Sequence, residues 1–386
     1  MTMNDITITP PAAMLVTASD HRGSWIPTWS MITTRFMELR KRRGLMIALV
    51  VVNIGIPTIF LVVRLFAHAF APHSYGPAGG YDIFTNLVAV VIYVFGFIVA
   101  ATLGCTAGSI DLTEGMYRHL VVTGRSRLAL YLARIPAGLA IVTSLVAVGF
   151  AIVCLVCVFA APKTISYDGA NNIQPNMSIS AFDTYAQTHL NVAICDLPYR
   201  NLNINVPCQY DGHGGGKIAS GNRAPTGFVM PSHATLEAYA LQIANQDYSS
   251  YRAIFLSPPV GLMVRAGLWV ELEAAIGFIV GLGLGSLLGQ RTISVILMLV
   301  LELVLTPIFS THVIPHLINF QRSIVGLATA HLEPAGLPLI FGGGGNGPQG
   351  ASLLVPETRA VAICVIVAWL VVWTALGAWR MMTRDA

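Results

Sequence analysis

The sequence predicts an all-α polytopic membrane protein with six transmembrane helices, cytoplasmic N and C termini, and a small mixed α/β domain inserted outside the membrane between helices 3 and 4. Of the 386 residues, 55% are hydrophobic and 10% are charged, and the mean hydropathy is +0.68. An average soluble domain carries about 25% charged residues. Six apolar runs are long enough to cross about 30 Å of hydrocarbon. They are residues 45–66, 83–107, 135–161, 268–289, 292–310 and 359–379.

The composition and motifs also exclude other classes. Six cysteines are too few for a disulfide scaffold of this length. A net charge of +4, from 22 basic and 18 acidic residues, is too small to indicate a nucleic-acid partner. A phosphate loop needs a glycine-rich turn followed by Lys and Ser or Thr. Residues 212–217 are followed by Ile218, and residues 342–347 contain no Lys, so any ATP is expected to be hydrolysed by another chain.

The positions of Lys and Arg predict the orientation, because short cytoplasmic segments are enriched in both. Basic residues gather in 35–43, before the first run, and in 118–134, between the second and third runs, whereas 67–82 contains none. Arg380 and Arg384 follow the last run. Six spans then place both termini in the cytoplasm of a multi-pass plasma-membrane protein. Residues 1–24 are expected to be a flexible cytoplasmic segment without a cleaved signal peptide.

Residues 25–44 predict an amphipathic helix that lies against the inner leaflet. Apolar residues recur there at spacings of four, three, four and three, which places them on one stripe of a helix. The charged residues are expected elsewhere on its circumference. The stripe consists of Trp25, Trp29, Ile32, Phe36 and Leu39.

An insertion of residues 162–259, rich in Asn, Gly, Pro and Tyr, is long enough to fold as a small outer domain. Its patterns predict helices at 181–192 and 232–245, and strand and turn structure at 201–210 and 212–216. Cys195 and Cys208 are its only cysteines. Because an outer compartment permits disulfides, we expect these two residues to be bridged.

Residues 311–358 are expected to form an extracytoplasmic loop with re-entrant helices. Their apolar stretch is interrupted by Pro315 and Gly326, which argues against a seventh span. His312 and His316 flank Pro315 without a nearby third ligand, so no metal site is expected. The remaining membrane segments are 260–310, with spans four and five, and 359–386, with span six and a cytoplasmic tail.

The segment 109–134, within the block 45–161 that holds the first three spans, has helix start and stop signals. Asp111 followed three residues later by Glu114 is typical of a helix N-terminus. Gly124 can end this helix in the left-handed conformation, and Ser126 can cap the next one. The sequence therefore predicts a short helix and turn at the cytoplasmic surface.

Two motifs around the first two spans carry a family resemblance. Phe36-x-Glu38-Leu-Arg-Lys-Arg-Arg43 precedes the first span, and Glu114-Gly115-x-x-Arg118-x-Leu-x-x-Thr-Gly124-x-Ser-Arg127 separates the second and third. Their order, with the Gln290-Arg291 turn and the outer helices between spans five and six, resembles the type-two permeases of the ABC exporters. The resemblance covers the six-span framework, and the insertion 162–259 departs from the simplest members.

The resemblance implies an elbow helix, and a coupling helix that fits a cleft in an ATPase subunit. It also implies two copies of an ABC ATP-binding subunit that hold ATP and Mg, a second permease copy in a homodimer, contact with membrane lipid, and no cofactor in this chain. The elbow role falls on Trp29, Phe36, Arg40, Lys41, Arg42 and Arg43. The coupling role falls on Asp111, Glu114, Tyr117 and Arg118.

Several polar or small residues lie inside the predicted spans. Glu302 is near the middle of span five, where a carboxyl group is costly unless it is paired, hydrated or protonated. Asn53, one turn before Pro57, is a second polar candidate for the translocation path. A glycine every four residues in span four permits close backbone approach by a helix of the same subunit or of a second copy. These glycines are Gly277, Gly281, Gly285 and Gly289.

These features together favour the permease subunit of an ABC exporter. The cargo is expected to be amphipathic or apolar, because the spans offer few charges to bind a polar one. One alternative is an ion- or proton-coupled carrier that uses Glu302, and another is a membrane-anchored receptor or assembly factor. No catalytic or metal-binding arrangement stands out, and Cys154 and Cys157 are expected to serve packing.

Overall fold

The computed structural model describes residues 25–71, 78–113, 126–161, 177–196, 206–209, 216–219, 228–255, 257–310, 318–335, 337 and 357–383. Within them, five helices are long and apolar enough to cross a membrane. These helices confirm the class of an all-α membrane protein. They span Arg43–Phe70, Tyr93–Asp111, Arg127–Phe159, Val260–Leu288 and Arg359–Thr383.

The predicted fifth span is helical but is not among those five. It consists of α12 (Arg291–Leu299), the π-helical η5 (Val300–Leu305) and α13 (Thr306–Ser310). The number of six spans therefore stays a prediction. Two short helices follow, α14 (Ile318–Arg322) and α15 (Val325–Ala330).

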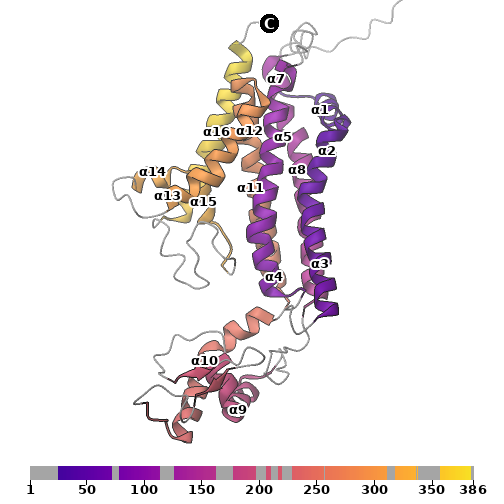
Figure 1. Ribbon diagram of the computed structural model, residues 1–386. Coiled ribbons are helices and arrows are strands. Elements are labelled where there is room, and N and C mark those ends of the chain that lie inside the picture. The colour runs from indigo at the N-terminus through magenta and orange to yellow at the C-terminus, as the bar shows by residue number, and fades with distance from the viewer. Residues whose placement is uncertain are drawn as a thin grey trace, which may run out of the picture.

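The long helices form one bundle around α11 (Val260–Leu288), which packs against α5 (Tyr93–Thr113), α8 (Arg134–Phe159) and α16 (Arg359–Thr383). Figure 1 shows α1 (Trp29–Lys41), α7 (Arg127–Leu132) and the C-terminal end of α16 at one end of the bundle. We call this the α1 end. The opposite end carries α4 (Tyr81–Asn86) and the small domain.

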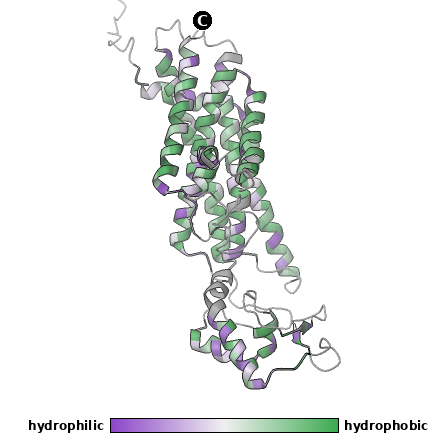
Figure 2. Cartoon of the chain, turned by 90° about the vertical axis from the view of Figure 1, so that its left-hand side faces the viewer, coloured by the Kyte–Doolittle hydropathy of each residue, from purple (hydrophilic) through white to green (hydrophobic). Residues whose placement is uncertain are grey.

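Most residues along the helices of the bundle are hydrophobic, as the colouring of Figure 2 shows. Large side chains on α3 (Ile56–Phe70) and α16 are more than half exposed, among them Ile59, Val63 and Val371. A soluble protein rarely exposes so large an apolar surface. The surface therefore fits contact with lipid.

Two helices widen to π-helical turns just before a proline. In the first span, η1 (Val51–Gly55) joins α2 (Arg43–Val50) to α3 and precedes Pro57, and η5 precedes Pro307 in the same way. A proline has no N–H to donate to the carbonyl four residues earlier, which favours a locally wider turn. A third π turn, η2 (Leu87–Ile92), joins α4 to α5.

The contact between α5 and α11 is a close approach of two backbones. A Cβ atom at Gly281 would lie 2.9 Å from the carbonyl oxygen of Ala101, and one at Gly285 would lie 2.5 Å from that of Cys105. On α5, Gly104 and Gly108 face the α11 backbone in the same way. The glycine spacing of span four therefore serves packing within the chain, between α11 and α5. Gly104 and Gly108 have the same spacing of four, a signal that the sequence reading missed.

Gly289 differs from the other three predicted packing glycines. It follows the last residue of α11 and has a φ of 68°, in the left-handed region, where its N–H bonds to the carbonyl of Gly285. Its inclusion in the packing face was wrong, because it terminates the helix.

The small domain between α8 and α11 is mainly helical. It contains α9 (Ile179–Thr188), the π-helical η3 (Val192–Asp196), a two-residue antiparallel ladder of β1 (Cys208–Gln209) and β2 (Lys217–Ile218), and α10 (His233–Phe255). Its apolar core includes Phe182, Ile194 and Ile243.

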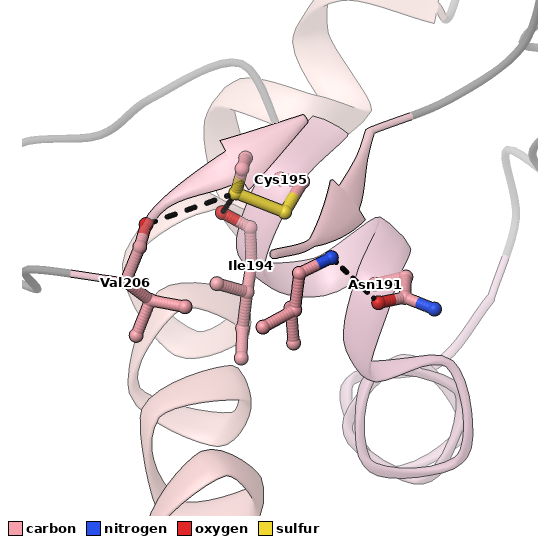
Figure 3. Close-up of a disulfide and its surroundings, with 6 residues drawn as sticks. Asn191, Ile194, Cys195 and Val206 are labelled. Atoms are coloured by element: carbon pink, nitrogen blue, oxygen red, sulfur yellow. Dashed lines mark hydrogen bonds between the residues drawn. A yellow bond between two sulfur atoms is a disulfide. The ribbon is translucent and has the colours of Figure 1, made fainter. Parts of the chain in front are cut away.

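The predicted disulfide joins η3 to β1. Cys195 and Cys208 are bonded with a Cα–Cα separation of 5.7 Å, which confirms the pairing (Figure 3). Beside it, the backbone N–H of Ile218 donates to Oδ1 of Asn191 over 3.0 Å. The bridge and this hydrogen bond together hold the strand ladder against the α9–η3 region.

Candidate functional site

A buried ion cluster joins three helices at the α1 end of the bundle. Arg35 of α1 donates from Nη1 and Nη2 to the two carboxylate oxygens of Asp111 on α5, over 3.0 and 2.7 Å. Arg134, the first residue of α8, also donates to Asp111. Arg35 donates further to Glu38 over 2.7 Å, so two cations face two anions. The cluster is neutral as a whole, and each of its charged groups is paired with an opposite charge.

The cluster lies almost entirely out of solvent. Asp111 is 0% exposed, Arg134 is 2% exposed and Arg35 is 7% exposed. Burial lowers the pKa of the Arg35 guanidinium, but the carboxylates of Asp111 and Glu38 outweigh that effect and hold its pKa above the ordinary value. Arg134 also donates to the carbonyl of Gly108, which accepts from Ser286 of α11 as well. The cluster is thereby linked to the central helix.

Asp111 has a different structural role from the one that its spacing predicts. It lies inside α5, which continues to Thr113, so the expected helix start at Asp111 was wrong. Inside a helix the backbone N–H groups are already bonded to carbonyls of the same helix. The buried carboxylate of Asp111 is stabilised instead by the opposite charges of two arginines.

The buried face of α1 also differs from the expected apolar stripe. The residues that pack against the bundle are Met31, Arg35 and Leu39, spaced by four, whereas Trp29 is 76% exposed. Sequence reading placed Arg35 on the polar side. The sequence does contain a signal for the burial of Arg35, because this residue lies one turn after Met31 and one turn before Leu39.

The other predicted elbow residues lie on the surface of α1 and the following turn. Arg40, Lys41 and Arg43 are exposed, and Phe36 and Arg42 are half-buried. Trp25 is 62% exposed. Phe36 packs against the bundle core, whereas Arg40 and Lys41 lie on the exposed side of the helix that Arg35 fastens to the bundle.

The residues predicted for ATPase coupling lie partly beyond what the structure describes. Glu114, Tyr117 and Arg118 fall in 114–125, outside the described residues. The structure does describe both flanks of this segment. On one side is Asp111, and on the other Ser126 caps α7 by accepting from the N–H of Ala129, as expected.

The short helix α7 is tied to the rest of the α1 end. Nη1 of Arg127 donates to the carbonyl of Met382 on α16 over 3.0 Å. Tyr131 is 0% exposed. A Cβ atom at Gly377 would collide with its hydroxyl group and with Gly283 of α11. The helix α7, which follows the segment 114–125 in the chain, is thus held to α16 and α11.

A second polar cluster lies deep in the bundle around Glu302. The hydroxyl of Tyr93 donates to Oε1 of Glu302 over 2.8 Å, and Glu302 is 2% exposed. Glu273 of α11 is 3% exposed, has one carboxyl oxygen without a partner, and lies near enough to Glu302 and Glu333 for their charges to interact. The sequence reading named Glu302 and missed its association with Glu273 and Glu333, which are 29 residues before it and 31 after it.

Asn53 has a structural partner. Its Nδ2 donates to the carbonyl of Leu145 on α8 over 2.7 Å, and the side chain is 0% exposed. A Cβ atom at Gly149 would lie 2.8 Å from the carbonyl oxygen of Asn53. This residue ties the first predicted span to the third at a point where the two backbones are close.

The remaining reactive residues form no further site in the described part of the chain. Among those residues, no group of three His, Cys, Asp or Glu side chains is arranged to hold a metal ion. Cys154 and Cys157 lie within α8 as free thiols. His312 and His316 lie outside the described residues.

Comparison of the chain with protein-family models, with curated proteins and with solved structures finds no match.

Proposed function

We propose that this chain is the membrane-spanning permease subunit of an ABC exporter. It pairs with a second copy of itself and with two copies of a separate ATP-binding subunit in the plasma membrane. In this proposal the α1 end of the bundle is cytoplasmic and the domain of α9 and α10 is outside. The chain forms the path for the cargo, and the ATP-binding subunit supplies ATP, Mg and hydrolysis.

The observation that carries this proposal is the ion cluster of Arg35, Asp111 and Arg134. Asp111 precedes the segment 114–125 by three residues, and Arg134 follows it by nine. Because all three groups are buried and paired, a force on this segment acts on α1, α5 and α8 together. A partner that pulls on the segment therefore moves helices rather than a loop.

The contacts of α7 support the same mechanism on the other side of the bundle. Arg127 reaches the end of α16, and Tyr131 packs between α16 and α11. Movement of the segment 114–125 is therefore passed to the central helix as well. A rigid link of this kind suits a subunit driven by a partner at its surface.

The nature of the spans supports an amphipathic or apolar cargo. Among the described residues, the charged side chains buried in the bundle are those of the two clusters, and the other buried side chains are apolar or, like Asn53, uncharged. Desolvating a charged cargo along such a path would be costly. Lipids, apolar drugs and hydrophobic peptides meet this requirement.

The proposal is tested by isolating the tagged chain from its native membrane. We expect an ATP-binding subunit to copurify and ATP hydrolysis to support cargo export from reconstituted vesicles. Arg35→Gln should keep the ATP-binding subunit bound but reduce export per ATP hydrolysed, whereas the exposed Arg40→Gln should behave as the parent. Transport that needs no ATP, or equal coupling in both variants, would contradict the proposal.

A further inference from the structure

The cluster around Glu302 lies where the short helix α15 packs on the bundle. A Cβ atom at Gly326 of α15 would lie 2.7 Å from Oε1 and 3.0 Å from Oε2 of Glu302, so the α15 backbone covers the carboxyl group directly. Nε1 of Trp269 on α11 donates to the carbonyl of Thr329 on α15 over 3.1 Å. The ring of Trp269 is stacked on that of Tyr93, with centroids 5.2 Å apart. The docking of α15 therefore depends on the state of Glu302 and its neighbours.

Three carboxyl groups from three parts of the chain lie near enough there for the charges of two of them to act on the third, Glu273. Glu302 comes from η5, Glu273 from α11, and Glu333 follows α15. The charges that act on Glu273 are those of Glu302 and Glu333, which have the same sign. One oxygen of Glu273 and one of Glu333 have no hydrogen-bond partner. Ionised carboxylates cannot share such a site without a cation, because repulsion and desolvation both oppose their charges.

The size of the site restricts the cation. Tyr93, Glu302 and Thr329 are each at most 2% exposed, and Glu273 is 3% exposed. The α15 backbone approaches the Glu302 carboxyl to contact distance. Among the described residues, no cluster has metal-ligand geometry. The ligand that fits such close packing is the proton.

We propose that Glu273, Glu302 and Glu333, together with Tyr93, form a proton-binding site that fastens α15 to the bundle. With protons bound, the carboxyl groups are neutral and hydrogen-bonded, and α15 stays docked. When protons leave, the carboxylates repel one another and α15 separates from α11 and η5. This inference does not rest on an ATPase partner.

The elements packed around this site carry other titratable and charged groups. Tyr93 is the titratable group of α5 in contact with it. Glu271 on α11 is two residues from Glu273 and about 200° around the helix, so it faces elsewhere. The outer segment contributes Arg322 of α14 and His331, whose Nδ1 is within 2.8 Å of the carbonyl of Leu327. Arg359 is the first residue of α16, which also packs on α15, and Glu357 lies two residues before it.

The direction of the pH response follows from Glu333, which lies outside the membrane-spanning segments. Burial raises the pKa of Glu333 to about 8, from an ordinary value of about 4.3. At pH values between these two pKa values, Glu333 is protonated while α15 is docked and ionised when α15 is undocked. The docking of α15 therefore weakens as the pH rises through this window and remains weaker above it.

Apolar packing of Val325 and Ala328 against α11 and α16, together with two hydrogen bonds, also holds the outer segment to the bundle. Nε1 of Trp369 on α16 donates to the carbonyl of Ser323 over 2.7 Å, and Nε2 of Gln321 donates to the carbonyl of Phe309 over the same distance. Neither involves the carboxyl groups. Loss of protons from the cluster therefore weakens the docking of α15 while these contacts keep its ends near the bundle.

The test uses a cysteine at position 330, where Ala330 of α15 is 8% exposed. Cys364, the exposed free thiol, is first replaced by Ser. Maleimide labelling of Ala330→Cys in the purified full chain is compared with the same probe in the triple variant Glu273→Gln, Glu302→Gln, Glu333→Gln. At each pH, the labelling rate in the parent background is divided by the rate in the triple variant. This ratio cancels the pH dependence of the thiol itself. Glu271→Gln is the matched control on the same helix.

We expect this ratio to rise about 100-fold between about pH 6 and about pH 8, because a group whose pKa is about 4.3 in the opened state and about 8 in the docked state weakens docking about tenfold per pH unit between those values. Glu271→Gln should show the same rise as the parent. Infrared spectra of the parent near neutral pH should contain a protonated-carboxyl band that weakens in Glu273→Gln and in Glu302→Gln. A constant ratio across this range, or a parent without such a band, would overturn the proposal.

Discussion

Arg35 in the first helix of the bundle forms a two-pronged hydrogen-bonded ion pair with Asp111, 76 residues later in the chain. Asp111 also accepts from Arg134 at the start of α8. A single buried carboxylate thus holds together three helices, on both sides of the segment 114–125. This relationship fixes where α1 lies and gives that segment a rigid base.

Removing the shared carboxylate should be costly. Asp111→Ala leaves Arg35 and Arg134 buried without their partner, and we expect the free energy of unfolding to fall by about 3–5 kcal/mol. Thermal denaturation of the purified chain in detergent measures this loss. Arg40→Ala, on the exposed side of α1, should change stability by no more than about 0.5 kcal/mol. Equal effects of the two substitutions would show that the ion cluster does not hold the helices.

Charge reversal in the segment 114–125 tests the proposed docking of the ATPase. If Glu114 and Arg118 fit a cleft in that subunit, Glu114→Lys combined with Arg118→Glu should uncouple ATP hydrolysis from export and leave the spans folded. Transport and hydrolysis are measured together in reconstituted vesicles, with circular dichroism as the check on folding. Unchanged transport in the double variant would remove the coupling role from these residues.

Glu302→Gln separates an ATP-driven exporter from a proton-coupled carrier. Gln keeps the shape of the neutral carboxyl group and can still accept from Tyr93, so an exporter should retain a substantial fraction of its transport rate. A carrier that binds and releases a proton at Glu302 in every cycle should lose accumulation against a gradient. The measurement is ATP-dependent export before and after collapse of the proton gradient. Loss of export on collapse, with ATP held constant, would favour the carrier.

The disulfide is expected to stabilise the outer domain. Cys195 and Cys208 are 13 residues apart, and in the chain-entropy model a loop of that size is worth about 3 kcal/mol. Cys208→Ser should therefore make the domain of α9 and α10 more sensitive to proteolysis than the parent. Cys364→Ser, which removes a free thiol from α16, is the matched control. Two free thiols at 195 and 208 in nonreduced peptide mass spectra of the parent would refute the bridge.

Two glycines of α11 should respond in opposite ways to alanine. At Gly281 a Cβ atom would lie 2.9 Å from a backbone oxygen of α5, so Gly281→Ala must push the two helices apart. Overpacking of this kind typically costs about 1–3 kcal/mol. At Gly261 nothing lies within 4 Å, and Gly261→Ala should be neutral or stabilise the helix by up to about 1 kcal/mol. Thermal denaturation of both variants checks the difference.

The sequence alone determined the features that depend on residues close together in the chain. The positions of five apolar helices, the cap at Ser126 and the backbone approach along α11 all follow from local composition and spacing. The disulfide could also be predicted, because Cys195 and Cys208 are the only cysteines of the outer domain.

Only the tertiary structure decided which polar groups meet. The Asp111 pattern is the same for a helix start and for a helix interior, and packing against Arg35 and Arg134 selected the interior. Glu302 was recognised from its depth in an apolar run, yet Glu273 and Glu333 reach it only because α11 and the chain after α15 pack there. Hydropathy and periodicity report the environment of each segment. The pairing of buried charges depends instead on which helices are neighbours, and contacts between residues distant in the chain decide that.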